Sequence, residues 1–234
     1  MNKLIVTLIL SLNVSLAYGE SLLLSIGAVD EGTDSARIGH RLAKEISQRG
    51  GVDIILVPVP ENRLITLLKS GRIDGDFTRI GEFQDAEPAL IQVAEPIGSF
   101  SYFAYTMKDD IEIDDWNSLI DYRVAYIEGS KIMAKKLKPI HDNIFPVKNT
   151  EAGLHFLAAG RADIFVHIEF LVEPLLKEKE FRKMEIRALK PRLHYVQTYM
   201  HLLTKHAELA KKIDKTLREM KADKTYDKLL RTLD

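Results

Sequence analysis

The sequence predicts an α/β protein made of two similar lobes, each with a mostly parallel sheet flanked by helices. Three observations carry this prediction: strand-like and helix-like apolar patterns alternate, one short motif occurs twice, and an extended segment separates its two copies. Alternating strands and helices are typical of parallel sheets, because parallel neighbours need a long crossover connection. With 234 residues, 46% of them hydrophobic, the chain is long enough to form two lobes with buried cores.

Composition excludes several functional classes. The chain has 33 Lys+Arg against 34 Asp+Glu, so it lacks the positive field that holds nucleic acid, and we expect no nucleic-acid partner. It has no Cys, which excludes disulfides, thiolate metal sites, iron–sulfur clusters and cysteine nucleophiles. The seven His residues are scattered, and there is no phosphate-binding glycine loop or nucleophile elbow. We therefore expect no cofactor, no metal site and no catalytic residues.

Residues 1–19 have the pattern of a secretory signal peptide. Lys3 gives a basic start, residues 4–16 are almost wholly apolar, and small residues stand at Ala17 and Gly19. The apolar run is shorter than the roughly 20 residues that span a bilayer, which favours cleavage near Glu20 over anchoring. No Cys follows the run, so no lipid anchor is expected. The prediction is a periplasmic protein; an uncleaved anchor or a buried first helix is the alternative.

The first lobe is predicted from four successive elements. A strand over residues 22–29 is followed by a helix with Asp34 or Ser35 as its N-cap, apolar residues at every fourth position from Ile38, and a stop at residues 50–51. A strand rich in β-branched residues follows over residues 52–59, and then a helix over residues 61–70. Strand, helix, strand and helix in this order predict a parallel sheet with helices on its faces.

The string Gly-Arg-apolar-Asp occurs at residues 71–74 and again at residues 160–163, each time after an apolar helix end and before a predicted strand. Glycine can adopt the left-handed conformation that ends a helix, and the Asp can then fix the turn before the strand. Two copies of one unit indicate two similar lobes. The alternative is two unrelated helix ends.

The second lobe is predicted from the segments between and after these copies. Residues 94–107 pass from loop to strand, as a crossover would, and residues 123–127 and 131–137 form a strand and a helix. Residues 171–183 have a helical pattern, and residues 189–203 form an extended return to the first lobe. We assign residues 20–102 and 195–234 to lobe 1 and residues 103–194 to lobe 2.

At this point the mature chain resembles the bacterial extracellular solute-binding proteins of family 3, the receptors of polar amino-acid ABC transporters. The resemblance implies a type II periplasmic binding protein-like fold, with two α/β lobes and two crossover segments, that closes on a small polar solute. It also implies an inner-membrane ABC transporter permease as partner. It rests on the signal peptide, both Gly-Arg-apolar-Asp units, Glu95-Pro96, Ser118-Leu119 before residues 123–130, and the tail at residues 217–226.

Two features depart from the amino-acid receptors of this family. Those receptors usually carry aromatic and proline residues just after the first strand, where this chain has Asp30, Glu31, Gly32 and Thr33. They also usually place a carboxylate-binding Arg well beyond the first-lobe Asp, whereas here Arg79 follows much sooner. The ligand class is therefore left open between amino acids and related carboxylate-bearing solutes.

Candidate ligand-binding residues follow the carboxyl ends of predicted strands, where open parallel sheets bind ligands. In lobe 2, the turn Glu128-Gly129-Ser130 opens a helix, so the amides of Ser130 and Lys131 and the Ser130 hydroxyl could hold a carboxylate. The alternative is that Ser130 only caps its helix.

In lobe 1, Arg79 is the best charged anchor, because its planar guanidinium can bind a carboxylate through two hydrogen bonds, with Asp76 to orient it. The alternative is a surface ion pair with Asp76 or Glu82. The other candidates are Thr78, Asp30 and Glu31 for an ammonium group, Glu169 beside His167, and Phe100 and Tyr102 as apolar cover; each has a structural alternative.

The function predicted is a monomeric binding protein, not an enzyme, that captures a small polar solute for a transporter. One alternative is a periplasmic cyclohexadienyl dehydratase-like enzyme on the same fold, with Glu169 or His167 as general acid. Another is a soluble ligand sensor that docks to a membrane kinase.

Overall fold

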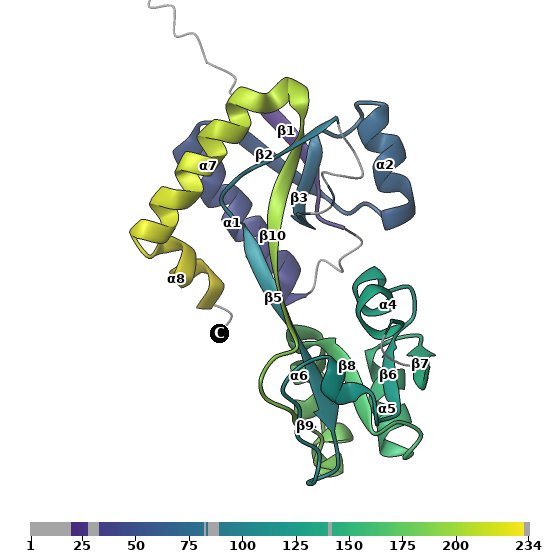
Figure 1. Cartoon of the computed structure of the whole chain (residues 1–234). Helices are drawn as coiled ribbons and strands as arrows, with labels where there is room; N and C mark the ends of the chain where they lie inside the picture. The colour runs from purple at the N-terminus through teal and green to yellow at the C-terminus, as the bar shows by residue number, and fades with distance from the viewer. Residues whose placement is uncertain (1–19, 28–32, 82, 84–88, 140–141, 232–234) are drawn as a thin grey trace, which may run out of the picture. The chain divides into compact units, whose positions relative to one another are not determined.

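The computed structural model describes residues 20–27, 33–81, 83, 89–139 and 142–231. The chain divides into two compact units. Unit 1 comprises the residues up to Phe77 together with Leu202–Asp234, and unit 2 comprises Thr78–His201. Figure 1 labels their elements. The chain passes from one unit to the other twice. Segments 78–102 and 195–201, which were assigned to lobe 1, group here with unit 2, and the exact lobe limits stay a prediction. The predicted signal peptide lies outside the described residues.

The sheet of unit 1 is parallel, as predicted. Strand β1 (Ser21–Ser25) lies between β2 (Asp53–Val57) and β3 (Gly75–Ile80) and pairs with both in parallel. Leu22 and Leu24 in β1 are completely buried. A central strand covered on both faces needs this run of apolar residues, which is why its sequence does not alternate.

Helices cover the strands of unit 1, and Figure 1 shows α1 and α7 on one side of them and α2 on the other. Thr33, not Asp34 or Ser35, caps α1 by accepting a hydrogen bond from the Ala36 amide, and Gly51 ends that helix in the left-handed conformation. The helices are α1 (Asp34–Gly50), α2 (Glu61–Lys69), α7 (Ala207–Ala222) and α8 (Thr225–Arg231). In the described part of the chain, every helix is too short or too polar to cross a membrane.

The sheet of unit 2 is mixed, with strand order β10-β5-β8-β6-β7. Strand β6 pairs in parallel with β7 and β8, whereas β5 runs antiparallel to β8 and β10. Two short strands, β4 and β9, pair with β10 and β5. The strands are β4 (Leu90–Gln92), β5 (Gly98–Thr106), β6 (Val124–Ile127), β7 (Ile144–Val147), β8 (Ile164–Ile168), β9 (Arg187–Ala188) and β10 (His194–Leu203).

Three helices belong to unit 2: α4 (Lys131–Leu137), α5 (Thr150–Ala158) and α6 (Glu169–Lys177). The helix predicted over residues 171–183 begins two residues earlier and ends at Lys177. A separate 3-10 turn follows over Phe181–Met184. Helix α6 contains Pro174 in its interior, and proline removes a backbone donor there.

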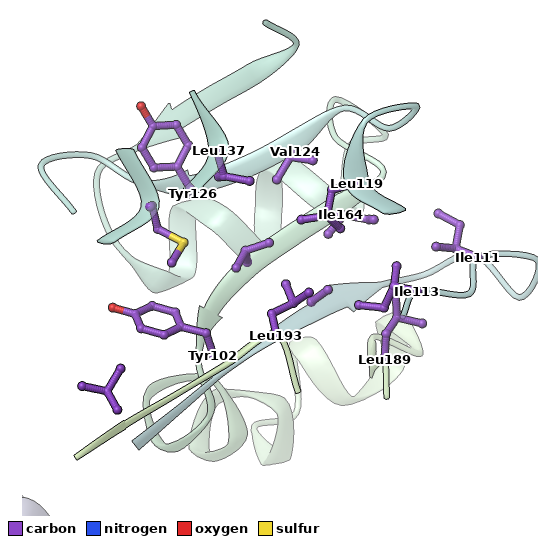
Figure 2. Close-up of a cluster of buried hydrophobic side chains, with 14 residues drawn as sticks. Tyr102, Ile111, Ile113, Leu119, Val124, Tyr126, Leu137, Ile164, Leu189 and Leu193 are labelled. Atoms are coloured by element: carbon purple, nitrogen blue, oxygen red, sulfur yellow. The ribbon is translucent and has the colours of Figure 1, made fainter. Parts of the chain in front are cut away.

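Alternating side chains of the unit 2 strands supply two separate cores, because successive side chains of a strand point to opposite faces. Tyr102 and Ala104 of β5 pack with Met133 and Leu137 of α4 on one face, the cluster drawn in Figure 2. Phe103 and Tyr105 pack on the other face, with residues of α5 and α6. The sheet is therefore buried on both faces.

Helix α5 lies close to β8 at Gly153. A Cβ atom on Gly153 would lie 2.3 Å from Cζ of Phe165, whose side chain is completely buried. Alanine would favour the helix by up to about 1 kcal/mol, but overpacking costs about 1–3 kcal/mol. We expect Gly153→Ala to lower the free energy of unfolding by about 1–2 kcal/mol, measured by urea unfolding. Phe165→Leu should lower the free energy of unfolding less in the Gly153→Ala variant than in the parent protein. If the effects of the two substitutions simply add, the contact between Gly153 and Phe165 is contradicted.

The two Gly-Arg-apolar-Asp units adopt the same conformation, which confirms them as one repeated structure. Gly71 and Gly160 have φ of 66° and 65°, the left-handed region that ends a helix. Asp74 accepts a hydrogen bond from the Leu23 amide at 3.1 Å, and Asp163 accepts one from the Arg123 amide at 2.9 Å. We expected each Asp to fix its own turn. Each instead joins the start of the strand that follows it to the neighbouring parallel strand, at Leu23 within β1 and at Arg123 just before β6, which sets the register of the pair.

Candidate functional site

One edge of the unit 2 sheet collects six of the predicted residues. The parallel strands β6 and β8 end at this edge, and the antiparallel strand β5 passes it at Tyr102, which lies opposite Ile168. The turn after β6 and the first residue of α6 follow at the same edge. We call this set the carboxyl-edge group: Phe100, Tyr102, Glu128, Gly129, Ser130 and Glu169.

The turn at residues 128–130 positions the hydroxyl of Ser130. Gly129 has φ of 80°, and the Ser130 amide donates to the carbonyl oxygen of Ile127 at 3.2 Å. The Ser130 hydroxyl oxygen accepts a hydrogen bond from the Met133 amide at 3.3 Å, so Ser130 caps α4. Glu128 is exposed, and its backbone amide donates a hydrogen bond to β7. The Ser130 amide is thus used in the turn, which leaves the hydroxyl as the polar group that this residue offers.

Tyr102 links this turn to the core. Its side chain is only 5% exposed, and its hydroxyl is hydrogen-bonded to the side chain of Ser130. Burial raises the pKa of Tyr102, and the hydrogen bond to Ser130 opposes that shift. In Figure 2 the rings of Tyr102 and Tyr126 lie at the same end of the cluster. The Tyr102 hydroxyl therefore stays protonated, as a neutral group at the carboxyl edge.

Aromatic rings extend the carboxyl edge toward α6. The Phe100 ring centre lies 5.7 Å from that of Tyr102 and 6.5 Å from that of Phe170, both in edge-to-face arrangements. Phe170 is 48% exposed although it is a large apolar residue. Glu169 precedes it as the first residue of α6. Burial raises the pKa of Tyr105, and the charge of Glu169 adds to that effect.

His167 is poorly suited to act as a general acid. Its side chain is 6% exposed, and its Nε2 atom lies 3.0 Å from the Thr150 hydroxyl oxygen. Burial lowers the pKa of His167 to about 4, so the imidazole is neutral near pH 7.

Arg79 lies at the end of β3, in unit 2. Its guanidinium carbon lies 5.0 Å from the ring centre of Phe83, and the His201 ring meets the same phenyl ring edge-to-face at 5.6 Å. Burial, followed by the nearby Arg79 charge, lowers the pKa of His201 to about 4. Thr78 donates its hydroxyl hydrogen to Thr198 at 2.9 Å, which ties β3 to β10. Arg79 is therefore held beside an aromatic ring.

Three of the predicted residues lie in unit 1 or outside the described residues. Asp76 belongs to unit 1 and is 1% exposed. Asp30 and Glu31 lie outside the described residues. Sequence reasoning missed Phe83, Phe170 and His201, because each contacts a predicted residue or its neighbour across strands and carries no local motif. Among the described residues, no cluster of three acidic or His side chains is placed to hold a metal ion.

The carboxyl-edge group offers hydroxyl groups and aromatic rings, and Arg79 offers a guanidinium beside Phe83. Such groups bind a polar ligand through directed hydrogen bonds and ring contacts. Comparisons with known proteins add a second kind of observation to this geometry. A family model described as bacterial extracellular solute-binding proteins, family 3, matches residues 31–232. An uncharacterized protein of Shewanella oneidensis is 25% identical over 201 residues, which are 82% of this chain and 70% of that protein.

Solved structures of solute receptors have a similar fold. The L-cystine solute receptor of Neisseria gonorrhoeae, in its unliganded open conformation, gives a TM-score of 0.68 at 17% identity, covering 91% of this chain and 92% of that chain. A mutant of ArgBP from T. maritima gives 0.64 at 23% identity, covering 90% and 93%. AbpA from Streptococcus pneumoniae, an amino acid ABC transporter substrate-binding protein bound to L-arginine, gives 0.62 at 18%, covering 90% and 92%. The predicted fold class, type II periplasmic binding protein-like, is confirmed.

Proposed function

Because this chain belongs to the bacterial extracellular solute-binding proteins of family 3, we propose that it captures a small polar solute bearing a carboxylate, an amino acid or a related compound, for an ABC-type transporter. It is exported by its signal peptide, acts in the periplasm as a monomer and delivers the solute to an inner-membrane permease. Ligand contacts to both lobes would stabilise a closed form that the permease recognises.

The observation that carries this proposal is the carboxyl-edge group. Six residues chosen from the sequence as ligand contacts follow the ends of β6 and β8 or lie in the adjoining part of β5, and the fold brings them to one edge of one sheet. Open α/β sheets bind their ligands at this edge. The group is joined within itself, through the Tyr102–Ser130 hydrogen bond and the Phe100–Tyr102 ring contact.

The carboxylate is assigned to Arg79. A guanidinium binds a carboxylate through two charge-assisted hydrogen bonds, and the Arg79 guanidinium lies over the Phe83 ring. The Ser130 and Tyr102 hydroxyls suit the uncharged polar groups of the same solute. Phe100 and Phe170 suit its apolar part.

A thermal-melt screen tests the proposal. The purified protein is melted with amino acids, small organic acids, sugars and polyamines, and a true ligand at 100 times its Kd adds about 2.7 kcal/mol to stability. We expect carboxylate-bearing solutes to raise the Tm. Arg79→Ala should weaken binding of the same solute by about 10- to 100-fold, the worth of a hydrogen-bonded charge, with the unliganded Tm nearly unchanged.

Arg72→Ala is the matched control, because Arg72 is an exposed arginine of unit 1, outside the carboxyl-edge group. It should bind the solute as the parent protein does. A screen in which only uncharged sugars raise the Tm would contradict the carboxylate. A large fall in the unliganded Tm of Arg79→Ala would instead assign Arg79 a structural role.

The proposal is a binding protein rather than a dehydratase. Its support is the state of His167, which is buried, in contact with Thr150 and neutral near pH 7. Incubation with prephenate or arogenate, followed by product absorbance, should give no turnover. Turnover that is lost in Glu169→Gln would establish the enzyme. A sensor would bind the same solute without supporting its uptake by cells, which a transport assay in a deletion strain distinguishes.

A further inference from the structure

A chain of two aromatic rings leads from Arg79 to strand β10. The Arg79 guanidinium carbon lies 5.0 Å from the ring centre of Phe83, a half-buried residue four positions further along the chain. The imidazole of His201, in β10, meets the same phenyl ring edge-to-face, with ring centres 5.6 Å apart and planes at 83° to each other. We call Phe83 and His201 the ring support of Arg79.

His201 is fixed by hydrogen bonds to two backbone segments. It is completely buried, and its Nδ1 atom lies 3.2 Å from the carbonyl oxygen of Tyr199. The backbone of Gly81, which stands between Arg79 and Phe83 in the chain, hydrogen-bonds to the same imidazole. A carbonyl oxygen can only accept, so Nδ1 carries a hydrogen. His201 therefore ties β10 to the turn that follows Arg79.

The second ring nitrogen of His201 shows that filling space is not the whole task of this residue. Among the residues that the structure describes, Nε2 is buried without a hydrogen-bond partner. An unpartnered buried polar atom costs stability, so a phenyl or leucine side chain would fill the same place at a lower cost. Only an imidazole both presents an aromatic ring to Phe83 and donates to the backbone beside it.

An arginine that binds a carboxylate gains from such a support. A long side chain loses rotamer freedom on binding, and this loss opposes binding. An aromatic ring attracts a guanidinium and restricts it before the solute arrives, so less freedom remains to be lost. Two parallel hydrogen bonds to a carboxylate also require one orientation of the guanidinium plane.

We propose that Phe83 and His201 are positioning residues of the carboxylate site: Phe83 orders the Arg79 guanidinium in advance of binding, and His201 fixes Phe83. This inference rests on the proposed function and deepens it, because it names the residues that set the orientation of its charged anchor. Neither residue is placed in contact with the solute itself.

The Arg79 Nε–Hε resonance of the 15N-labelled protein tests the first step, and its absence from the spectrum of Arg79→Ala assigns it. A ring shifts the resonances of nearby protons, so Phe83→Leu should move this resonance toward that of a free arginine, and Phe83→Tyr should keep it in place. Phe156→Leu is the matched control, because Phe156 is a half-buried phenylalanine of the same unit whose ring lies 5.9 Å from the guanidinium carbon of Arg161. It should leave the Arg79 resonance unchanged.

Acetate and acetamide are the binding probes, because they differ in charge and little in size. At an ionic strength held constant with sodium chloride, acetate should shift the Arg79 resonance saturably and acetamide should not. Phe83→Leu should weaken acetate binding about 3- to 10-fold, the worth of a cation–ring contact, and His201→Leu should weaken it as well. Phe83→Tyr and Phe156→Leu should bind acetate as the parent does.

The outcomes separate the positioning role from the proposed function. If acetate leaves the Arg79 resonance of the parent protein unchanged, the carboxylate site is wrong and its positioning residues with it. If the parent binds acetate and Phe83→Leu binds it equally well, only the positioning role is overturned. An equal loss in Phe156→Leu would overturn it too. Phe83→Leu is the deciding variant, because Phe83 is only half-buried whereas His201 lies in the core.

Discussion

Replacing Asp163 with alanine is expected to lower the free energy of unfolding by about 3 kcal/mol, the upper range for a hydrogen-bonded charge. The Asp163 side chain is only 10% exposed, and its two oxygens accept hydrogen bonds from the Arg123 guanidinium at 3.0 Å each. The Arg123 amide and the Lys108 ammonium bind the same carboxylate. The bonds from Arg123 lower the pKa of Asp163 well below its usual range, although burial opposes them.

Urea unfolding of the purified variant measures this loss. Asp121→Ala is the control, because Asp121 is exposed on the same unit, and its removal should change the stability by less than about 0.5 kcal/mol. Asp74→Ala should resemble Asp163→Ala, since Asp74 bonds to Leu23, His206 and Lys205 in unit 1. Equal stability of Asp163→Ala and the parent would contradict the role of the repeated Asp.

Acidification is expected to destabilise the protein between about pH 6.5 and pH 4, because His167 and His201 are buried as neutral imidazoles. Burial lowers the pKa of each to about 4 in the folded protein, whereas the unfolded chain binds the proton near pH 6.5. The unfolded state therefore holds more protons in this window, and stability falls as the pH falls. Each histidine contributes about 3 kcal/mol to the loss, which is complete at about pH 4.

Unfolding free energies measured at several pH values between 7 and 4 test this prediction. His167→Gln and His201→Gln should each flatten the dependence on pH. His40→Gln is the control, because His40 is exposed on α1 and should leave the dependence unchanged. The pKa of Asp163 lies below this window, so the stability that its carboxylate contributes is lost only at lower pH. A stability that stays constant from pH 7 to pH 4.5 would show that neither imidazole is held neutral by folding.

The order of elements could be predicted from sequence because it rests on local patterns. The parallel strands of unit 1 and the strand–helix pair at residues 124–137 follow from apolar periodicity and glycine stops. The break after Lys177 could not be predicted, since the apolar pattern continues into the 3-10 turn. The cap of α1 was predicted one or two residues too late, because Thr33, Asp34 and Ser35 all suit an N-cap.

The site could be predicted in part. Residues that follow strand ends were found because topology alone brings those ends to one edge, as with Ser130 and Glu169. The partners that orient them were not found. Phe83 beside Arg79 and Phe170 beside Phe100 depend on which strands pair and in what register.

The amino-acid sequence by itself determined the α/β class, the repeated Gly-Arg-apolar-Asp unit and the helix stops at Gly71 and Gly160, since each depends on a few neighbouring residues. The tertiary structure alone decided that the two Asp carboxylates join separate strands, that Tyr102 meets Ser130, and that burial lowers the pKa of His167 and of His201. The physical reason is that hydrogen bonds across strands and the burial of an imidazole arise from residues far apart in the chain, and no local pattern encodes them.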